Sequence, residues 1–266
     1  MQQKMSTDKT PDWRDHPVGS EAFLAARRAA MAEQVWPVED PSYAPVGHER
    51  GIRTSTRITS NYRGTHRKRS MDVKPEEVID VLKHAQVTRW VLMGLHGYVG
   101  YLSDPRATQD VDVLIDHDFK HQAVKAIQLR WPQLETREAD VAVRFHDPGD
   151  VDADGKPKPV IDLMLPWSNI HAEILKYHVI VDPETGHHLP NLEAALCAKY
   201  AAMVSPHRAF DRKSQDAVDF RLIVKCNLND IDRERLQTLA EFVWTGAGPE
   251  ILEFLDLAVN DQPFPL

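Results

Sequence analysis

The chain has 266 residues, of which 42% are hydrophobic and 27% charged, and a formal net charge of −8 at pH 7. These proportions are ordinary for a globular protein of one large domain or two small ones. No apolar run approaches the roughly 20 residues that a membrane-spanning helix needs, and the first residues lack the apolar core of a secretory signal. We therefore expect a cytoplasmic protein without membrane contact, whose only cysteines, Cys197 and Cys226, are buried thiols.

Residues 1–74 read as a polar N-terminal arm with one helix, which begins after Ser20 as its N-cap and runs over residues 21–35. Between residues 50 and 70 the arm carries seven Lys or Arg residues and no acid. Such a basic stretch could touch nucleic acid phosphates. A flexible connector or a solvated segment is the open alternative. After this helix, we expect the next regular structure only at Lys74.

A mixed α/β core is predicted over residues 75–185. Its first helix has Pro75 in the first turn and ends near His84. The remaining elements of this core follow in chain order: strand 89–94, strand 110–115, helix 118–130, strand 141–145, an acidic hairpin loop over 150–155, and strand 158–164.

A helical subdomain is predicted over residues 186–266. Its candidate helices span residues 191–204, 210–226, 232–244 and 249–259. The fold class is therefore α+β, with a mixed β-sheet, flanking helices and a C-terminal helical part.

Three aspartates lie in strand-like apolar runs, where a carboxylate is costly unless something pairs with it. Asp110 and Asp112 share one strand face because successive strand side chains point to opposite faces. The strand over residues 158–164 could pair alongside and bring Asp162 to the same edge. Three clustered carboxylates repel one another unless cations bridge them, and hard oxygen ligands suit Mg²⁺. The usual partner of such a metal cluster is a nucleoside triphosphate.

The strand before these acids ends at Gly94. A strand that runs into glycine and then a helix offers backbone N–H groups to a triphosphate, since the chain can approach closely without a Cβ. Glycine here, with two aspartates on the next strand, predicts a phosphate cradle opposite a metal cage.

Residues 94–112 resemble the nucleotidyltransferase superfamily typified by DNA polymerase β, whose signature is a strand ending in Gly-Gly or Gly-Ser followed by Asp-x-Asp. Residues 105–112, Pro-Arg-Ala-Thr-Gln-Asp-Val-Asp, are more narrowly similar to the AbiEii-like abortive-infection toxins of bacteria. The resemblance covers about residues 88–226. It implies transfer of a nucleoside monophosphate from a nucleoside triphosphate to a hydroxyl, with release of pyrophosphate.

The resemblance also implies roles for individual residues. Gly94 would be the phosphate-loop glycine, and two Mg²⁺ ions would be held by Asp110, Asp112 and Asp162. Asp162 would also help to deprotonate the acceptor hydroxyl.

Three further residues lie in the implied nucleotide-binding segment. Arg106 and Thr108 match the Arg-x-Thr that precedes the aspartates in the family, and Arg106 would bind phosphate or orient Asp110 through a bidentate contact. Where the family has a second small residue directly after the glycine, this chain has Leu95, whose larger side chain could obstruct the approach of the phosphates.

On the helix over residues 191–204, four residues share one face: Leu192, Leu196, Lys199 and Met203. A lysine in this apolar stripe must snorkel, pair or serve a ligand. The pattern of Lys199, Arg208, Asp216 and Asp219 is similar to a helical region of the toxin branch. By that similarity Lys199 contacts the nucleotide phosphates, and Asp216 or, more favoured, Asp219 completes the site.

The acceptor is not specified by these motifs. The toxin-like resemblance suggests RNA, such as a tRNA 3′ end, and a separately encoded antitoxin as partner, whereas a protein or antibiotic hydroxyl stays open. A non-catalytic member of the fold that binds nucleotide or RNA is the alternative that Leu95 motivates. Phosphoryl transfer of the kinase type is a third possibility.

Overall fold

The computed structural model describes residues 20–22, 44–67, 70–152 and 154–266. The chain divides into two compact units, residues 1–36 and residues 37–266. In the first unit the helix expected over residues 21–35 lies almost wholly outside the described residues.

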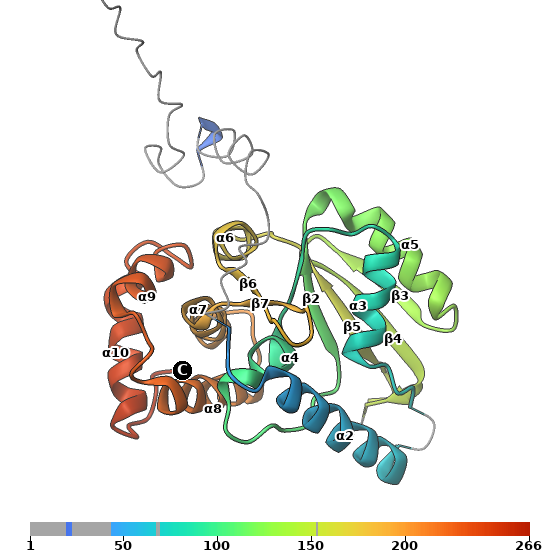
Figure 1. Ribbon diagram of the computed structural model, residues 1–266, viewed down its shortest axis with the longest axis horizontal. Coiled ribbons are helices and arrows are strands. Elements are labelled where there is room, and N and C mark those ends of the chain that lie inside the picture. Colours follow the sequence, from blue (N-terminus) through green and yellow to red (C-terminus); the bar gives the residue numbers. More distant parts are fainter. Residues whose placement is uncertain (1–19, 23–43, 68–69, 153) are drawn as a thin grey trace, which may run out of the picture. The chain divides into compact units, whose positions relative to one another are not determined.

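A five-stranded mixed sheet forms the centre of the second unit (Figure 1). The strand order is β1 (Trp90–Leu92), β2 (Val111–Ile115), β5 (Pro157–Met164), β4 (Ala142–Val151) and β3 (Glu135–Ala139). Strands β2 and β5 pair in parallel, and the other neighbours pair antiparallel. A second, two-stranded ladder joins β6 (Val179–Val181) to β7 (His188–Pro190). The predicted α+β class with a mixed sheet is confirmed.

The two faces of the sheet differ because the strand residues alternate. Val111 and Val113 of β2 are buried in the main hydrophobic core with Ile161 and Leu163 of β5. Helices α3 (Pro75–His84) and α5 (Lys120–Arg130) cover this face, the latter after the short helix η4 (His117–Phe119). The intervening residues of the same strands, which include Asp112 and Asp162, therefore point to the opposite face.

Regular structure begins earlier than Lys74, so that expectation is wrong. Helix α2 (His48–His66) packs against the rest of the unit, with Ile52 only 1% exposed. Its Gly51 lies against Val99 of the short helix η3 (Val99–Tyr101). The buried stripe of α2 consists mainly of small or polar residues, so the hydrophobic pattern of the sequence does not reveal it.

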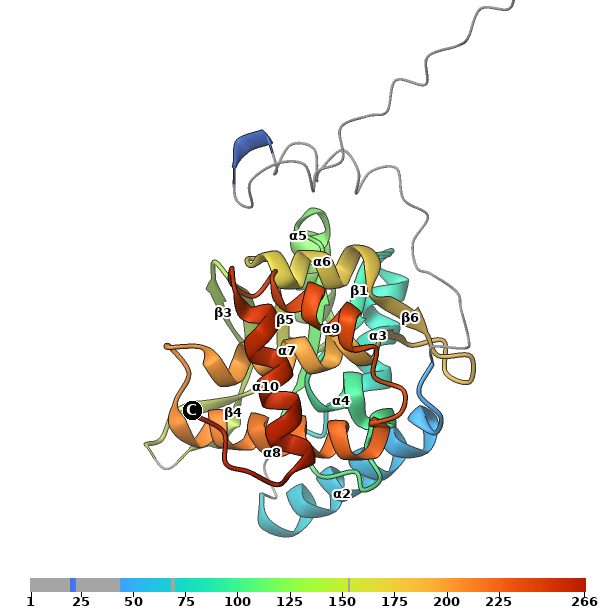
Figure 2. The same cartoon turned by 90° about the vertical axis from the view of Figure 1, so that its left-hand side faces the viewer.

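The C-terminal helices lie on the side of the sheet opposite α3 and α5 (Figures 1 and 2). They are α6 (Asn169–Tyr177), α7 (Leu192–Val204), α8 (Phe210–Asn227), α9 (Arg233–Ala240) and α10 (Ala247–Val259). The four helices predicted in this region are present, with α9 shorter than expected. The sequence patterns do not predict α6, β3 or the small ladder. In the described part of the chain, no helix combines the length and apolar character needed to cross a membrane.

A matched pair of glycine substitutions tests the packing of the turn after β1. In the five-residue helix α4 (Gly94–Tyr98), a Cβ on Gly97 would collide with the Leu92 carbonyl oxygen and approach Pro190 Cδ to 3.4 Å. We expect Gly97→Ala to lower the free energy of unfolding by about 2 kcal/mol or more, since strand backbone cannot move away cheaply. Gly64→Ala in α2 meets nothing within 4 Å and should instead stabilise by about 0.5–1 kcal/mol. Urea unfolding of both variants measures the contrast, and equal stability of Gly97→Ala and wild type would contradict this packing.

Candidate active site

Two aspartates from neighbouring strands meet on the face of the sheet that α3 and α5 leave uncovered. Asp112 of β2 is the direct partner of Asp162 of β5, and Arg144 of β4 is the partner of Asp162 on its other side. Paired residues on adjacent strands point to the same face, about 4.8 Å apart. Arg144 Nε donates to both carboxylate oxygens of Asp162, at 3.3 and 3.1 Å. The sequence-based expectation that Asp162 lies beside Asp112 agrees with this register.

Gly94 lies directly against the Asp112 carboxylate. The Met93 N–H donates to the Asp112 carbonyl oxygen at 2.9 Å, which brings the chain after β1 alongside β2. Gly94 has φ +54°, and a Cβ there would collide with Asp112 Oδ2. Glycine is therefore required at this position to leave room for the carboxylate. The helix that follows has only five residues, so a role of Gly94 in cradling phosphate stays a prediction.

The surroundings of the Asp112 carboxylate disfavour its ionised form. Burial and the nearby carboxylates of Asp110 and Asp162 raise its pKa well above the ordinary value, and Lys199 and Arg208 oppose this only in part. Burial also raises the pKa of Asp162, against the opposing effect of Arg144. Two adjacent, partly buried carboxylates with raised pKa values form a place where an added cation would be stabilised.

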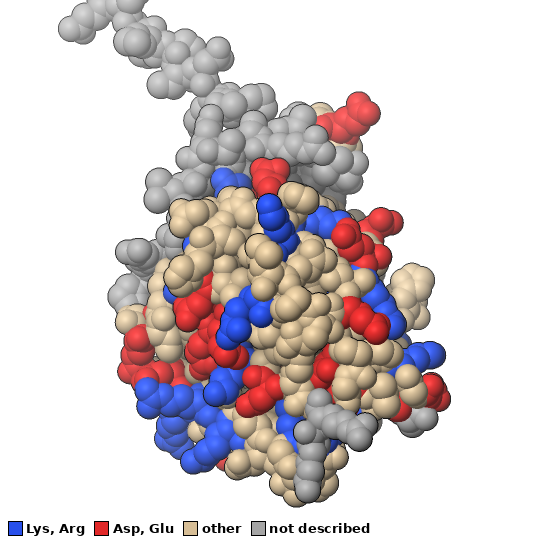
Figure 3. Space-filling model, turned by 90° about the vertical axis from the view of Figure 1, so that its right-hand side faces the viewer, with Lys and Arg blue, Asp and Glu red and all other residues tan. Residues whose placement is uncertain are grey.

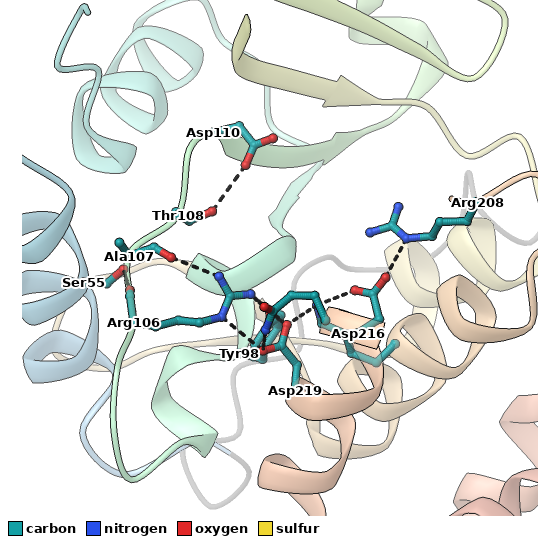
Figure 4. A network of polar contacts seen from close by, with 11 residues as sticks. Ser55, Tyr98, Arg106, Ala107, Thr108, Asp110, Arg208, Asp216 and Asp219 are labelled. Carbon is teal, nitrogen blue, oxygen red and sulfur yellow. Dashed lines mark hydrogen bonds and ion pairs between the residues drawn. The ribbon is translucent and has the colours of Figure 1, made fainter. Parts of the chain in front are cut away.

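Asp110 is placed differently. Strand β2 begins one residue later, at Val111, so the strand alternation does not extend to Asp110. Its Oδ1 accepts a hydrogen bond from Thr108 Oγ1 at 3.3 Å (Figure 4). Asp110 lies beside Arg63 and His96 and is not among the residues that line the large cavity next to Asp112. It contributes negative potential to Asp112 from outside that cavity.

Asp112 and Asp162 could hold Mg²⁺ only together with ligands from outside the protein. Among the described residues, no three His, Cys, Asp or Glu side chains are arranged to hold a metal ion. However, Mg²⁺ is commonly held by one or two carboxylates, with substrate phosphates and water completing its shell. Asp112 and Asp162 fit that second kind of site. Metal binding by Asp110, Asp112 and Asp162 together stays a prediction.

A cavity of about 970 Å³ separates the carboxylates from the C-terminal helices. Gly94, Asp112, Asp162 and Arg144 line it from the sheet, and Lys199, Arg208 and Asp216 line it from the helices. The volume is in the range of small-molecule sites. Residues more than a hundred positions apart in the sequence thus share one cavity, in which Asp112 and Asp162 lie on one wall and Lys199 and Arg208 on the other.

Lys199 is buried between two carboxylates of α8. Its Nζ donates to Asp216 Oδ1 at 2.9 Å and to Asp219 Oδ2 at 2.8 Å, and lies 4.4 Å from the centre of the Tyr98 ring. Burial alone would lower the pKa of Lys199, but Tyr98, Asp219 and Asp216 outweigh burial and raise it. Lys199 is therefore a paired lysine that lines the cavity, and not a snorkelling one.

Arg106 makes a bidentate contact with Asp219 instead of Asp110 (Figure 4). Its Nε donates to Asp219 Oδ1 at 3.1 Å and its Nη2 to Oδ2 at 2.8 Å. Tyr98 donates to the same Oδ2 at 2.6 Å, and the Arg106 carbonyl oxygen accepts from Ser55 of α2 at 2.7 Å. The interpretation that Arg106 orients Asp110 is thus wrong. Asp219 is fully buried and outside the cavity lining, where it holds Arg106 and Lys199 in place.

The remaining predicted residues also lie outside the cavity lining. The Leu95 side chain is only 2% exposed and belongs to the protein interior, so its bulk does not occupy the cavity. Thr108 joins Asp110 to α2, since its N–H donates to Thr59 Oγ1 at 3.2 Å. Arg144 is a cavity residue that the sequence reasoning missed. The register of the β4–β5 hairpin, which places Arg144 opposite Asp162, is the signal that would have found it.

Comparisons with known proteins give distant structural similarity. No protein-family model and no curated protein matches the chain. An antigenic nucleotidyltransferase-like protein from Paracoccidioides brasiliensis is 17% identical, with 67% of this chain and 89% of that chain covered and a TM-score of 0.36. JHP933 from Helicobacter pylori is 13% identical, with 70% and 89% covered and a TM-score of 0.39. Similarity at this level does not define an activity for this chain.

The pairing of Asp219 predicts a specific pH dependence of stability. Although burial opposes it, Lys199 and Arg106 lower the pKa of Asp219 to about 2. The ionised carboxylate therefore contributes stability above about pH 4, and this contribution is lost as the pH falls towards 2. We expect the difference in unfolding free energy between wild type and Asp219→Asn to shrink by about 2 kcal/mol between pH 5 and pH 2.

Urea unfolding across this pH range measures the effect. Asp256→Asn is the matched control, because Asp256 pairs with Arg233 on the surface, where both side chains are at least half exposed. That variant should follow wild type at every pH. A difference for Asp219→Asn that does not change with pH would mean that Lys199 and Arg106 do not hold Asp219 ionised.

Proposed function

We propose that this protein is a Mg²⁺-dependent nucleotidyltransferase, which transfers a nucleoside monophosphate from a nucleoside triphosphate to a hydroxyl. One observation carries the proposal: the adjacent carboxylates of Asp112 and Asp162 face Lys199 and Arg208 across one cavity. A triphosphate with its cation needs both kinds of group, since carboxylates hold the cation and basic side chains hold the phosphates.

The basic wall is suited to phosphate oxygens. Arg208 donates through Nε to Asp216 Oδ2 at 2.5 Å, and its two terminal nitrogens carry further N–H donors for a phosphate. Lys199 uses two of its three donors on Asp216 and Asp219 and has one more to offer. Positioning and charge neutralisation are most of what phosphoryl chemistry demands of a protein.

The acidic wall is suited to the cation and to the acceptor. Bound Mg²⁺ would neutralise charge on the triphosphate and on the departing pyrophosphate. Asp162 is held by Arg144 and has a raised pKa, which makes its carboxylate a stronger base towards the acceptor hydroxyl. In-line attack of that oxygen on the α-phosphorus forms the new ester bond and breaks the bond to pyrophosphate.

A second candidate function is nucleotide binding without catalysis. The observation that favours it is that protein groups already neutralise Asp162 and Lys199 in this structure. In that case nucleotide would bind equally well without Mg²⁺, and no labelled product would form.

Asp112→Asn separates these candidates. We expect at least a 100-fold loss of labelled nucleotide incorporation into total RNA, because the substitution removes the charge that faces the cation. Thermal stability should not fall, since asparagine removes a partly buried charge beside another carboxylate. Incubation with each labelled triphosphate, with Mg²⁺ or with a chelator, measures the activity, and mass spectrometry of the product shows whether a nucleotidyl or a phosphoryl group was transferred.

Asp256→Asn, on the surface of α10, is the matched control and should retain full activity. Incorporation that persists in Asp112→Asn or with a chelator would contradict the proposed reaction. Nucleotide binding that is unchanged under both conditions, without incorporation, would favour the binding protein.

RNA is the acceptor that we propose, on the basis of helix α2. Arg50, Arg53 and Arg57 are exposed and three or four residues apart, and so lie along one side of the helix. The exposed Tyr62 stacks on His66 with 4.7 Å between ring centres, which gives a platform for a base. Figure 3 shows Lys and Arg side chains gathered at the lower edge of the molecule on the side where α2 lies.

Charge reversal on α2 tests this acceptor. We expect Arg50→Glu combined with Arg57→Glu to weaken RNA binding at least tenfold and to reduce its salt dependence, because two phosphate contacts are lost. Binding of nucleoside triphosphate should be unchanged. Filter binding of labelled RNA at several salt concentrations measures the effect. Lys125→Glu combined with Arg130→Glu on α5 changes the net charge equally and should bind as wild type does; equal loss in both double variants would show that only net charge matters.

A further inference from the structure

The cavity has a second end that the phosphate chemistry does not use. Besides its charged residues, it is lined by a set of apolar and aromatic side chains: Val141, Met164, Trp167, Ile170, Val243 and Trp244. A triphosphate and its cation contact charged groups, so this apolar wall fits a different part of a ligand. In a nucleotide that part is the base, whose faces are flat and apolar.

Trp167 is the residue of this wall that is most available to a ligand. Its side chain is largely in solvent, with 61% exposed, although it borders a cavity. A large aromatic ring left exposed inside a concave site is typical of a binding surface. Trp244, by contrast, is fixed by a hydrogen bond from its Nε1 to Tyr200 Oη at 3.0 Å.

The same strand positions Trp167 and the carboxylate Asp162. Asp162 and Met164 of β5 are alternate residues that both line the cavity, and the chain then turns towards α6. The Trp167 N–H donates to the Leu165 carbonyl oxygen at 2.8 Å, which closes a tight turn at the end of the strand. Five residues span at most about 17 Å, so Trp167 and Asp162 line the same cavity no farther apart than that.

His171 adds a polar group beside the indole. The two ring centres are 5.9 Å apart, and His171 Nδ1 lies 2.6 Å from Ser168 Oγ. Burial lowers the pKa of His171 to about 4, so the ring is neutral at pH 7. A neutral imidazole can donate or accept one hydrogen bond at the edge of a base without attracting phosphate.

We propose that Trp167 binds the base of the nucleoside triphosphate by stacking, with His171 at the edge of that base. This inference rests on the proposed function, because it assigns the base-binding end of the same cavity. The phosphates would then lie between Arg208 and the two carboxylates, and the base would lie along the apolar wall.

Two ligands separate the ends of the cavity. Inorganic tripolyphosphate carries the phosphates without a base, and a non-hydrolysable nucleoside triphosphate analogue carries both. Isothermal titration of the full chain with each ligand, in the presence of Mg²⁺, gives the two affinities. We expect Trp167→Ala to weaken nucleotide binding roughly 5- to 150-fold, the range that one base–aromatic stack supports, and to leave tripolyphosphate binding unchanged.

Two further variants serve as controls. Trp167→Phe keeps an aromatic face and should bind nucleotide within about threefold of wild type. Leu129→Ala removes a side chain that is 74% exposed on α5, behind the other face of the sheet, and should bind both ligands as wild type does. A thermal melt of each variant verifies that it folds.

The outcomes are distinct. Equal nucleotide affinity of Trp167→Ala and wild type, or equal weakening of both ligands, would overturn the role of Trp167 in base binding. Failure of wild type to bind either ligand would instead overturn the proposed function itself.

Discussion

The parallel pairing of β2 with β5 is the constraint from which the rest of the site follows. It places the carboxylates of Asp112 and Asp162 side by side on a partly buried face, where like charges raise each other's energy. The neighbouring groups are arranged around that cost. Because Gly94 has no side chain, there is room for the Asp112 carboxylate. Arg144 of β4 binds the Asp162 carboxylate, and Lys199 and Arg208 line the opposite wall of the cavity.

Asp219 has a different part in the same arrangement. It lies outside the cavity, yet it binds Arg106 from the segment before β2 and Lys199 from α7. Removing one partner of such a buried pair is costly, because it leaves the other charge uncompensated. Asp219 therefore connects the segment before β2 to helices α7 and α8 and holds the Lys199 side chain in position. Asp216 lines the cavity together with Arg208, to which it is hydrogen-bonded.

The sequence predicts the part of this architecture that local patterns determine. Alternation in the two apolar strands is enough to place Asp112 and Asp162 on one face, and the apolar stripe of α7 is enough to mark Lys199 as unusual. Partner choice among charged side chains is not local, so the sequence leaves Arg106 with either phosphate or Asp110 as its partner, whereas the fold brings it to Asp219.

The sequence pattern does not predict helix α2 or strand β3, and the physical reason differs between the two. Helix α2 docks through Ile52 and small residues such as Gly51 and Ser55, which leave a weak hydrophobic signal. Strand β3 is a polar edge strand whose residues are almost all exposed, so it lacks the alternation that marks β2 and β5. Asp110 was expected on the same strand face as Asp112, but β2 begins one residue later, at Val111. An error of one residue in a strand boundary is therefore enough to misplace a side chain.

The distribution of paired charges gives the cavity an internal polarity. Among the charged residues that line the cavity, Asp112 and Asp162 outnumber Arg144 on the sheet side, whereas Lys199 and Arg208 are balanced by Asp216 and Glu250 on the helix side. With both sheet carboxylates ionised, an electric field runs across the space between the walls even though the whole protein is acidic. The acidic sheet wall would repel a bare polyanion, whereas a cation bound between the polyanion and the two carboxylates would remove that repulsion.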